Sequence, residues 1–92
     1  MKVRVFGTLR SVVGGSKEIE VCPEGRSSAL KVLDQLITAY PALEEKLFSE
    51  DEKLQAGVNI FVNGRSVRFL DGLSTLLEEG DELALFPPLG GG

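Results

Sequence analysis

The last residues of the chain have types and spacing that could support chemistry. The sequence ends Phe86-Pro87-Pro88-Leu89-Gly90-Gly91-Gly92, so two prolines and one hydrophobic residue precede three glycines. Proline fixes φ at about −65° and keeps the base of a tail extended. Glycine has no Cβ, so a glycine tail fits a channel that is too narrow for other residues. We therefore expect the tail to deliver the carboxylate of Gly92 to a site on another protein.

Each tail residue has an expected role. The Pro87-Pro88 pair limits the entropy lost when the tail is ordered, and Leu89 sits near the mouth of the receiving pocket. From Leu89 to Gly92 the chain reaches roughly 13 Å, at about 3.3 Å per residue. Gly90 adds flexibility, and Gly91 enters the channel together with Gly92. A frayed end without function is the alternative, which the Phe-Pro-Pro-Leu spacing after a hydrophobic strand disfavours.

The side chains offer little chemistry of their own. The sequence has no histidine and one cysteine, Cys22, which excludes an internal disulfide and leaves too few ligands for a zinc site or an iron–sulfur cluster. Asp81 and Glu82 are adjacent carboxylates after Gly80, and we interpret them as turn residues rather than an acid–base pair. We expect no catalytic side chain, no bound cofactor and no metal.

The composition indicates an ordinary acidic domain. Of the 92 residues 42% are hydrophobic and 26% are charged, and the formal net charge is −4. This length suffices for one core, and an acidic chain with scattered basic residues does not suit nucleic acid. No apolar stretch approaches the ~20 residues of a membrane helix, and the charged start Met1-Lys2-Val3-Arg4-Val5 is unlike a signal peptide. We expect a cytoplasmic protein with no nucleic-acid or membrane partner.

Apolar periodicity predicts two strands and two helices in the first half of the chain. Residues 2–8 and 17–21 alternate, which predicts a hairpin with a long loop. A helical stripe then follows a capping serine and ends before Pro41. Its members are Ala29, Val32, Leu33, Leu36, Ile37 and Tyr40. A short second helix turns Leu43 and Leu47 inward.

The second half predicts three more strands. Residues 57–62 alternate and run into Asn63-Gly64, a strong hairpin signal, after which residues 65–68 return as a short strand. Residues 69–77 form a connection anchored by leucines, and residues 82–86 form the last strand. This order predicts an α+β fold of the β-grasp (ubiquitin-like) type, with a mixed sheet, one main helix packed across it and a short second helix.

A β-grasp arrangement has consequences for the tail. The first and last strands are then parallel neighbours in the middle of the sheet, so the last strand directs the tail out of a rigid base. We expect one β-grasp domain over residues 1–87 and a flexible tail over residues 88–92.

Strand parity predicts an apolar patch beside the tail. If the valines of the first strand face inward, Phe6 faces the other side of the sheet, and the same parity applies to Phe61 and Phe86. These strands are neighbours in a β-grasp, so the three rings form a docking surface for partners. The alternative is a bulge at Gly7 that turns Phe6 into the core.

Three segments closely resemble the small subunit of molybdopterin synthase, the MoaD family. They are Val3–Arg10, Val58–Gly64 and Glu79–Gly92, the last with an acidic Gly-Asp-Glu turn, an apolar strand, Phe-Pro-Pro and a terminal Gly-Gly. The resemblance covers the whole chain. Gly90 departs from the pattern as a third glycine where the family varies more freely.

The resemblance implies a sulfur carrier. The carboxylate of Gly92 would be adenylated with ATP by an adenylyltransferase of the ubiquitin-activation type (MoeB-like) and converted to a thiocarboxylate with sulfur from a donor. The tail would then enter a molybdopterin synthase large subunit (MoaE-like) and give sulfur to a pterin precursor, for molybdenum or tungsten cofactor. Arg10 matches an arginine that recurs near the activating-enzyme interface, with a solvated surface arginine as the alternative.

Three other functions fit the same residues. A ubiquitin-like modifier would join Gly92 to lysines through isopeptide bonds, and a thiamin-type carrier (ThiS) shares the tail but is usually shorter. A non-carrier interaction module would use only the phenylalanine patch. Because carrier and modifier need the same tail, the residues do not separate them.

Overall fold

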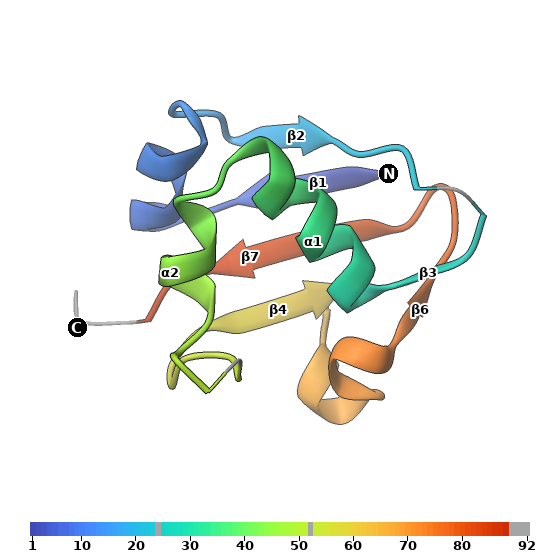
Figure 1. Cartoon of the computed structure of the whole chain (residues 1–92). Coiled ribbons are helices and arrows are strands. Elements are labelled where there is room, and N and C mark those ends of the chain that lie inside the picture. The colour runs from blue at the N-terminus through green and yellow to red at the C-terminus, as the bar shows by residue number, and fades with distance from the viewer. Residues whose placement is uncertain (24, 52, 89–92) are drawn as a thin grey trace.

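In the part of the chain that the structure describes, a five-stranded mixed sheet forms one layer and two α-helices cover one of its faces (Figure 1). The computed structural model describes residues 1–23, 25–51 and 53–88. The strands are β1 (Lys2–Val5), β2 (Glu18–Glu20), β3 (Ser27–Ser28), β4 (Asn59–Val62), β5 (Arg65–Ser66), β6 (Leu76–Leu77) and β7 (Glu82–Phe86). The α-helices are α1 (Ala29–Ala39) and α2 (Leu43–Leu47), and the 3₁₀ segments are η1 (Gly7–Val13), η2 (Val67–Phe69) and η3 (Gly72–Ser74).

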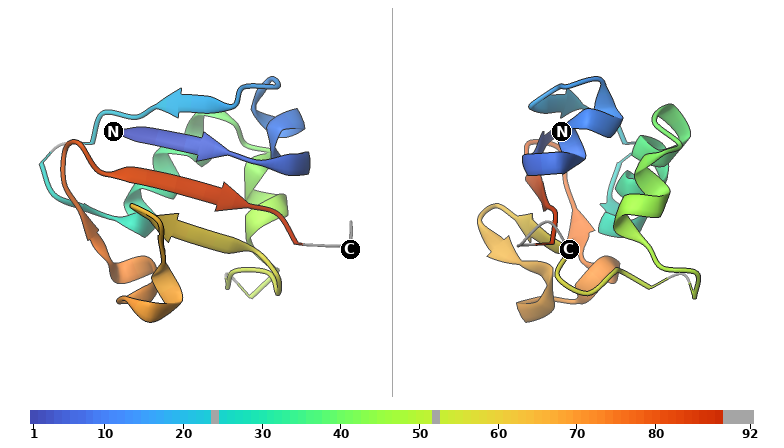
Figure 2. Two further views of the ribbon diagram at one scale, coloured as in Figure 1. Left: turned by 180° about the vertical axis from the view of Figure 1, so that it is seen from behind. Right: turned by 90° about the vertical axis from the view of Figure 1, so that its left-hand side faces the viewer.

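The sheet order is β2-β1-β7-β4-β5, and β3 and β6 form a separate small pair. β7 is parallel to β1 and antiparallel to β4, so the last strand is the middle strand of the sheet. Viewed from behind, the strands lie in front of both α-helices (Figure 2). The fold is the predicted ubiquitin-like β-grasp of the α+β class, with β1 and β7 as parallel neighbours.

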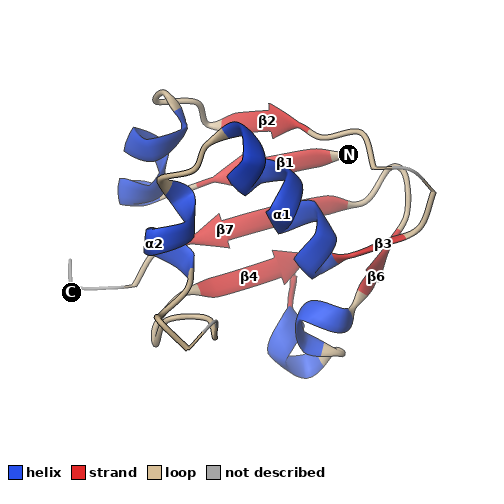
Figure 3. Ribbon diagram, viewed as in Figure 1, coloured by secondary structure: helices blue, strands red, loops and turns tan. Residues whose placement is uncertain are grey.

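The helix α1 forms where its apolar stripe predicts it. The Ser28 hydroxyl caps the first turn by accepting a hydrogen bond from the Lys31 amide at 3.2 Å. The helix ends at Ala39 because Pro41 disfavours helical angles at Tyr40, which takes a φ of −131°. α2 follows at once and, with α1, makes up the helical layer (Figure 3).

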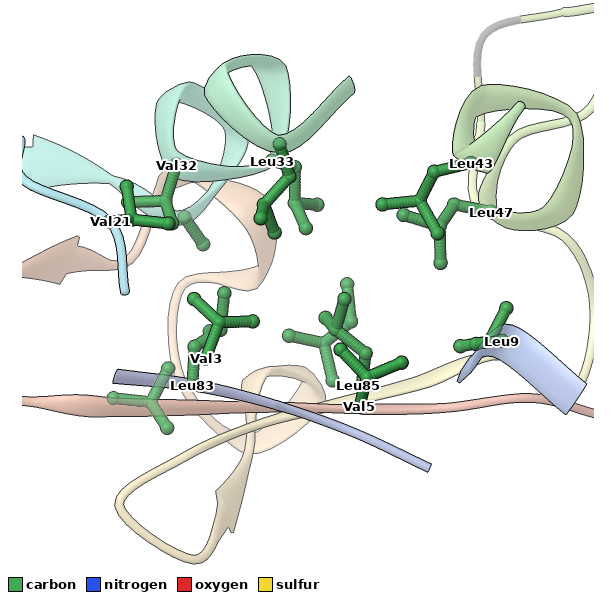
Figure 4. Close-up of a cluster of buried hydrophobic side chains, with 14 of the residues drawn as sticks. Val3, Val5, Leu9, Val21, Val32, Leu33, Leu43, Leu47, Leu83 and Leu85 are labelled. Atoms are coloured by element: carbon green, nitrogen blue, oxygen red, sulfur yellow. The ribbon is translucent and has the colours of Figure 1, made fainter. Parts of the chain in front are cut away.

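The core lies between this helical layer and the sheet (Figure 4). Leu83 and Leu85 of β7 are fully buried, and the sheet register sets Leu85 beside Val5 on one side and Ile60 on the other. Leu33 approaches from α1. Each fully buried side chain of this size contributes about 1.5–3 kcal/mol. The strand that leads to the tail is therefore held by buried side chains of both flanking strands and of α1.

Some local predictions were wrong. The first strand ends at Val5 rather than residue 8, because Gly7 takes a φ of +58° and begins η1. Val67 and Arg68 lie in η2 instead of a strand. The pairing of β3 with β6 was missed, and it leaves Leu76 57% exposed although the leucines of this connection were expected to face inward. None of the helices in the described residues is long and apolar enough to cross a membrane.

The position of Leu85 leads to a stability prediction. Leu85→Ala should lower the free energy of unfolding by about 2–5 kcal/mol, because it leaves a cavity beneath the central strand. Leu76→Ala is the matched control and should change stability by less than about 0.5 kcal/mol, since the side chain is exposed. Urea unfolding of both variants measures the difference. Equal losses for the two variants would contradict the central position of β7.

Candidate functional site

The end of β7 is where the chain leaves the sheet toward its C-terminus. The Phe6 amide donates a hydrogen bond to the Leu85 carbonyl at 3.1 Å. The β1–β7 pairing therefore continues almost to the end of β7. Pro87 has no N–H, so it cannot continue the ladder. The ends of β1 and β7 and the start of β4 therefore meet at one edge of the domain (Figure 1).

Three phenylalanine rings meet at this edge, on the sheet face that α1 and α2 do not cover. Phe6 stacks on Phe86, with ring centroids 4.4 Å apart and an interplanar angle of 6°. Phe61 meets Phe86 edge-on, with centroids 5.2 Å apart and an angle of 76°. Such pairs contribute about 0.5–1.5 kcal/mol each beyond the area that they bury. We call Phe6, Phe61 and Phe86 the aromatic cluster.

The cluster confirms the predicted orientation of all three rings and refines their exposure. Each ring is half-buried rather than open, because each covers part of its neighbour. The alternative that Gly7 marks a bulge turning Phe6 into the core is wrong, although Gly7 does end the strand. A half-buried apolar surface of stacked rings therefore lies directly beside the base of the tail.

Arg10 extends the aromatic cluster with a positive charge. Its Nε donates to the Val5 carbonyl at 2.8 Å, and its guanidinium carbon lies 5.7 Å from the centroid of the Phe6 ring. A cation over an aromatic face gains about 0.5–1 kcal/mol at an exposed site. Within the described part of the chain no carboxylate lies within ion-pair distance of Arg10. Its terminal N–H groups can therefore pair with a carboxylate of another protein.

The far end of the same sheet face is charged. Arg4 Nε lies 3.2 Å from a Glu82 carboxylate oxygen and 3.8 Å from one of Glu18, and Lys2 Nζ lies 3.8 Å from Glu18. These side chains are about half exposed, so each pair contributes little to stability. The face is thus divided into an apolar end beside the tail and an ionic end away from it.

Asp81 lies in the turn before β7, as predicted, whereas Glu82 is the first residue of β7 rather than a turn residue. The Asp81 carboxylate accepts from the Glu78 amide at 2.7 Å and from the Asn63 side-chain amide at 3.1 Å. Asn63 in turn accepts from the Glu82 amide at 2.9 Å. These bonds tie the β4–β5 hairpin to the turn before β7. Among the described residues, no group of three or more Cys, Asp or Glu side chains could hold a metal ion.

The structure brings together four of the residues predicted to contact partners, Phe6, Arg10, Phe61 and Phe86, at the base of the predicted tail. Pro87 and Pro88 follow β7 and are half-buried. The remaining predicted tail residues, Leu89, Gly90, Gly91 and Gly92, lie outside the described residues.

Two glycines at this edge were not assigned a role in the tail from the sequence. Gly7 lies against Pro87, and Gly57 lies against Pro88. A glycine that turns the chain and a glycine that makes room for a neighbour look the same in a single sequence. No sequence signal therefore identifies this role.

Comparison with known proteins relates this arrangement to carriers and modifiers. Residues 3–92 match the ThiS family. The chain is 37% identical to small archaeal modifier protein 1 of Haloferax volcanii over the full length of both. It is 34% identical to sulfur carrier protein CysO of Mycobacterium tuberculosis over 91% of this chain and 89% of that protein. Identity to the molybdopterin synthase sulfur carrier subunit of the same organism is 29% over 100% and 96% of the two chains.

Solved structures agree with the fold. The crystal structure of the Haloferax volcanii modifier SAMP1 superposes with a TM-score of 0.86 at 36% identity, covering 99% of this chain and 97% of that one. A chain of the Amycolatopsis orientalis BexX/CysO complex superposes with a TM-score of 0.85 at 31% identity, covering 99% and 98%. A carrier of this shape is thus found in complex with a partner protein.

Proposed function

Because this chain belongs to the ThiS family of sulfur carriers and ubiquitin-like modifiers, we propose that it is a sulfur carrier whose reactive group is the C-terminal carboxylate of Gly92. One observation carries the proposal: β7 is paired on both sides and ends beside the aromatic cluster and Arg10. A strand paired on both sides gives the tail a rigid base. The cluster gives an enzyme a surface to hold while the tail enters its active site.

The proposed chemistry starts by activating the carboxylate. A carboxylate is a poor electrophile, so one oxygen of the Gly92 carboxylate attacks the α-phosphorus of ATP and pyrophosphate leaves. Hydrosulfide then attacks the carbonyl carbon of the resulting acyl adenylate. The bond from that carbon to the adenylate oxygen breaks, and AMP leaves with the electron pair. The product is a thiocarboxylate, formed without net oxidation or reduction.

Other proteins supply the catalytic groups in this proposal. An adenylyltransferase of the ubiquitin-activation type (MoeB-like) binds ATP and forms the adenylate, while a sulfur donor provides the hydrosulfide. The chain itself binds no cofactor or metal and contributes docking and delivery. Arg10 favours an acidic group on the enzyme surface that faces the aromatic cluster, since a guanidinium pairs well with a carboxylate. Because ATP is required, we propose that the protein acts in the cytoplasm.

The acceptor that we propose first is the pterin precursor of molybdenum or tungsten cofactor. The chain would then be the small subunit of molybdopterin synthase, with its tail inserted into a MoaE-like large subunit. The relative named molybdopterin synthase sulfur carrier subunit supports this, as does the resemblance of residues 79–92 to the MoaD tail. The match to the ThiS family keeps a thiamin-type acceptor open.

A second candidate is a protein modifier. It is favoured by the higher identity, 37% over both full lengths, to a relative named small archaeal modifier protein 1. The same acyl adenylate would then be attacked by the amine of a substrate lysine, which forms an isopeptide bond and releases AMP. Both functions begin with the same activation step, so one chain is able to serve both.

The carrier proposal predicts a thiocarboxylate on the native protein. Intact mass spectra of the protein from its own host should show a species in which one oxygen of the C-terminal carboxylate is replaced by sulfur. A host that lacks the activating enzyme provides the control and should give only the carboxylate. If no sulfur-bearing species forms while the host makes cofactor, the carrier proposal fails.

The modifier proposal predicts a remnant on substrate lysines. Trypsin is unsuitable for finding it, because the last basic residue is Arg68 and the remnant would run from Phe69 to Gly92. Chymotrypsin cleavage after Leu89 should instead leave Gly90–Gly92 on the modified lysine. Finding such lysines supports the modifier role. Their absence together with a thiocarboxylate leaves the carrier role alone.

The aromatic cluster should govern affinity for the activating enzyme. Phe61→Ala should raise the KM of the carrier as substrate by about tenfold or more, because truncating a central interface aromatic costs ~2 kcal/mol or more. Phe69→Ala is the matched control, since Phe69 lies in η2 and is 86% exposed outside the cluster. Steady-state adenylation assays, with thermal unfolding to verify folding, measure the effect. Equal KM values for the two variants would show that the aromatic cluster is not part of the docking surface.

A further inference from the structure

Two glycines contact the two prolines at the base of the tail. In the described residues, the glycines with positive φ are Gly7, Gly14, Gly15, Gly25, Gly57, Gly64, Gly72 and Gly80. Around most of them nothing lies within 4 Å of the position that a Cβ would occupy. Gly7 and Gly57 are the exceptions within this set, and the atoms that they face belong to Pro87 and Pro88.

The contacts leave little room for a side chain at either position, and least at Gly7. A Cβ on Gly7 would lie 2.8 Å from Pro87 Cγ and 3.3 Å from Pro87 Cδ. A Cβ on Gly57 would lie 3.1 Å from Pro88 Cβ and 3.3 Å from Pro88 Cα. The Pro87 ring therefore overlaps the position of a Cβ on residue 7, while Pro88 would have to move by a few tenths of an ångström to admit a Cβ on residue 57.

The two contacts come from opposite sides of β7. Gly7 follows β1, and Gly57 precedes β4, the two strands that flank β7 in the sheet. The first residue after β7 is thus held from the β1 side and the second from the β4 side. Proline fixes φ in both residues, so a ring held in place also fixes the direction of the backbone.

We propose that Gly7, Gly57, Pro87 and Pro88 form a proline seat that sets the direction in which the tail leaves the sheet. Gly7 and Gly57 are then positioning residues for delivery of the C-terminal carboxylate, and in this respect the inference rests on the proposed function. In this proposal the aromatic cluster binds the enzyme, and the proline seat orients the tail toward the enzyme's active site. Because the first two residues of the tail are already ordered, less conformational entropy is lost when the tail enters the active site.

The turn requirement alone does not explain the seat. Positive φ accounts for glycine at positions that face open space, and it would do the same at Gly7 and Gly57. The seat adds a separate requirement, which is room for a proline. The two requirements can be separated because the chain contains glycines that share the backbone strain and lack the contact.

The matched glycines lie in similar local structure. Gly72 begins η3 with a φ of +59°, as Gly7 begins η1 with a φ of +58°. Gly64 has a φ of +85°, close to the +89° of Gly57. Gly72→Ala and Gly64→Ala should therefore carry the strain of an L-residue at positive φ without disturbing a proline.

The first experiment tests the contacts in solution. NOESY spectra of the wild-type protein should show cross-peaks from the Gly7 Hα protons to the Pro87 ring and from the Gly57 Hα protons to the Pro88 ring. Gly57→Ala should shift the Pro88 resonances, while Gly64→Ala should leave them unchanged. If both wild-type cross-peaks are missing, the seat does not exist.

The second experiment tests the positioning role with the activating enzyme and ATP. Gly7→Ala and Gly57→Ala should lower kcat for adenylation by about tenfold or more, since a misplacement on the order of 1 Å can cost ~100-fold. KM should stay within about twofold of the wild type, because the aromatic cluster that sets docking is unchanged. Gly72→Ala and Gly64→Ala should keep both constants near the wild-type values.

A third variant replaces a proline of the seat instead of a glycine. Pro87→Ala removes the Cγ and Cδ atoms that face Gly7, leaves every glycine unchanged and adds no positive-φ strain, so it should fold normally and still lower kcat. If Gly7→Ala, Gly57→Ala and Pro87→Ala all match the two control variants in kcat, the positioning role is wrong. Failure of the proposed function would look different, because the wild-type chain itself would then not be adenylated.

Discussion

The pairing of β7 on both of its edges is the constraint on which the rest of the structure depends. β7 is the last strand in the sequence and the middle strand in space, parallel to β1 and antiparallel to β4. The sheet therefore closes only when the C-terminal segment is in place. Because Leu83 and Leu85 are fully buried, β7 is held both by its pairing and by the core.

Side chains alternate between the two faces of β7, and the two faces contact different parts of the molecule. The inward leucines join α1 and α2 to the sheet, while the outward residues run from Glu82 at the ionic end to Phe86 in the aromatic cluster. Phe86 contacts both Phe6 and Phe61, so it connects the three neighbouring strands on the outer face. One strand thus contributes to the core and to the outer apolar surface, and in the function that we propose it also directs the tail.

Much of this could be predicted from the sequence because the responsible signals are local. The last strand was predicted with its observed bounds, since a Gly80-Asp81 turn precedes it and Pro87 ends it. The stripe of α1 and the Asn63-Gly64 turn are equally strong local patterns. Strand parity then gave the common orientation of the three phenylalanines once the β-grasp order was assumed.

The missed features depend on contacts between distant segments. The β3–β6 pair has two residues in each strand, which is too short for a periodic pattern, and it joins residues 27–28 to residues 76–77. The half-burial of the aromatic cluster arises from ring-to-ring packing that one strand alone does not encode. The contact of Gly57 with Pro88 likewise becomes visible only when the sheet is assembled.

The central proposal is that the folded domain delivers the C-terminal carboxylate of Gly92 to another protein and that this carboxylate is the group that is activated. The most direct test is a semisynthetic chain whose Gly92 ends in a carboxamide, compared with the natural chain in ATP–pyrophosphate exchange by the activating enzyme. The account predicts that the carboxamide binds the enzyme with an unchanged Kd and supports no exchange. Exchange at the natural rate with the carboxamide would contradict it, because the nucleophile would then lie elsewhere in the chain.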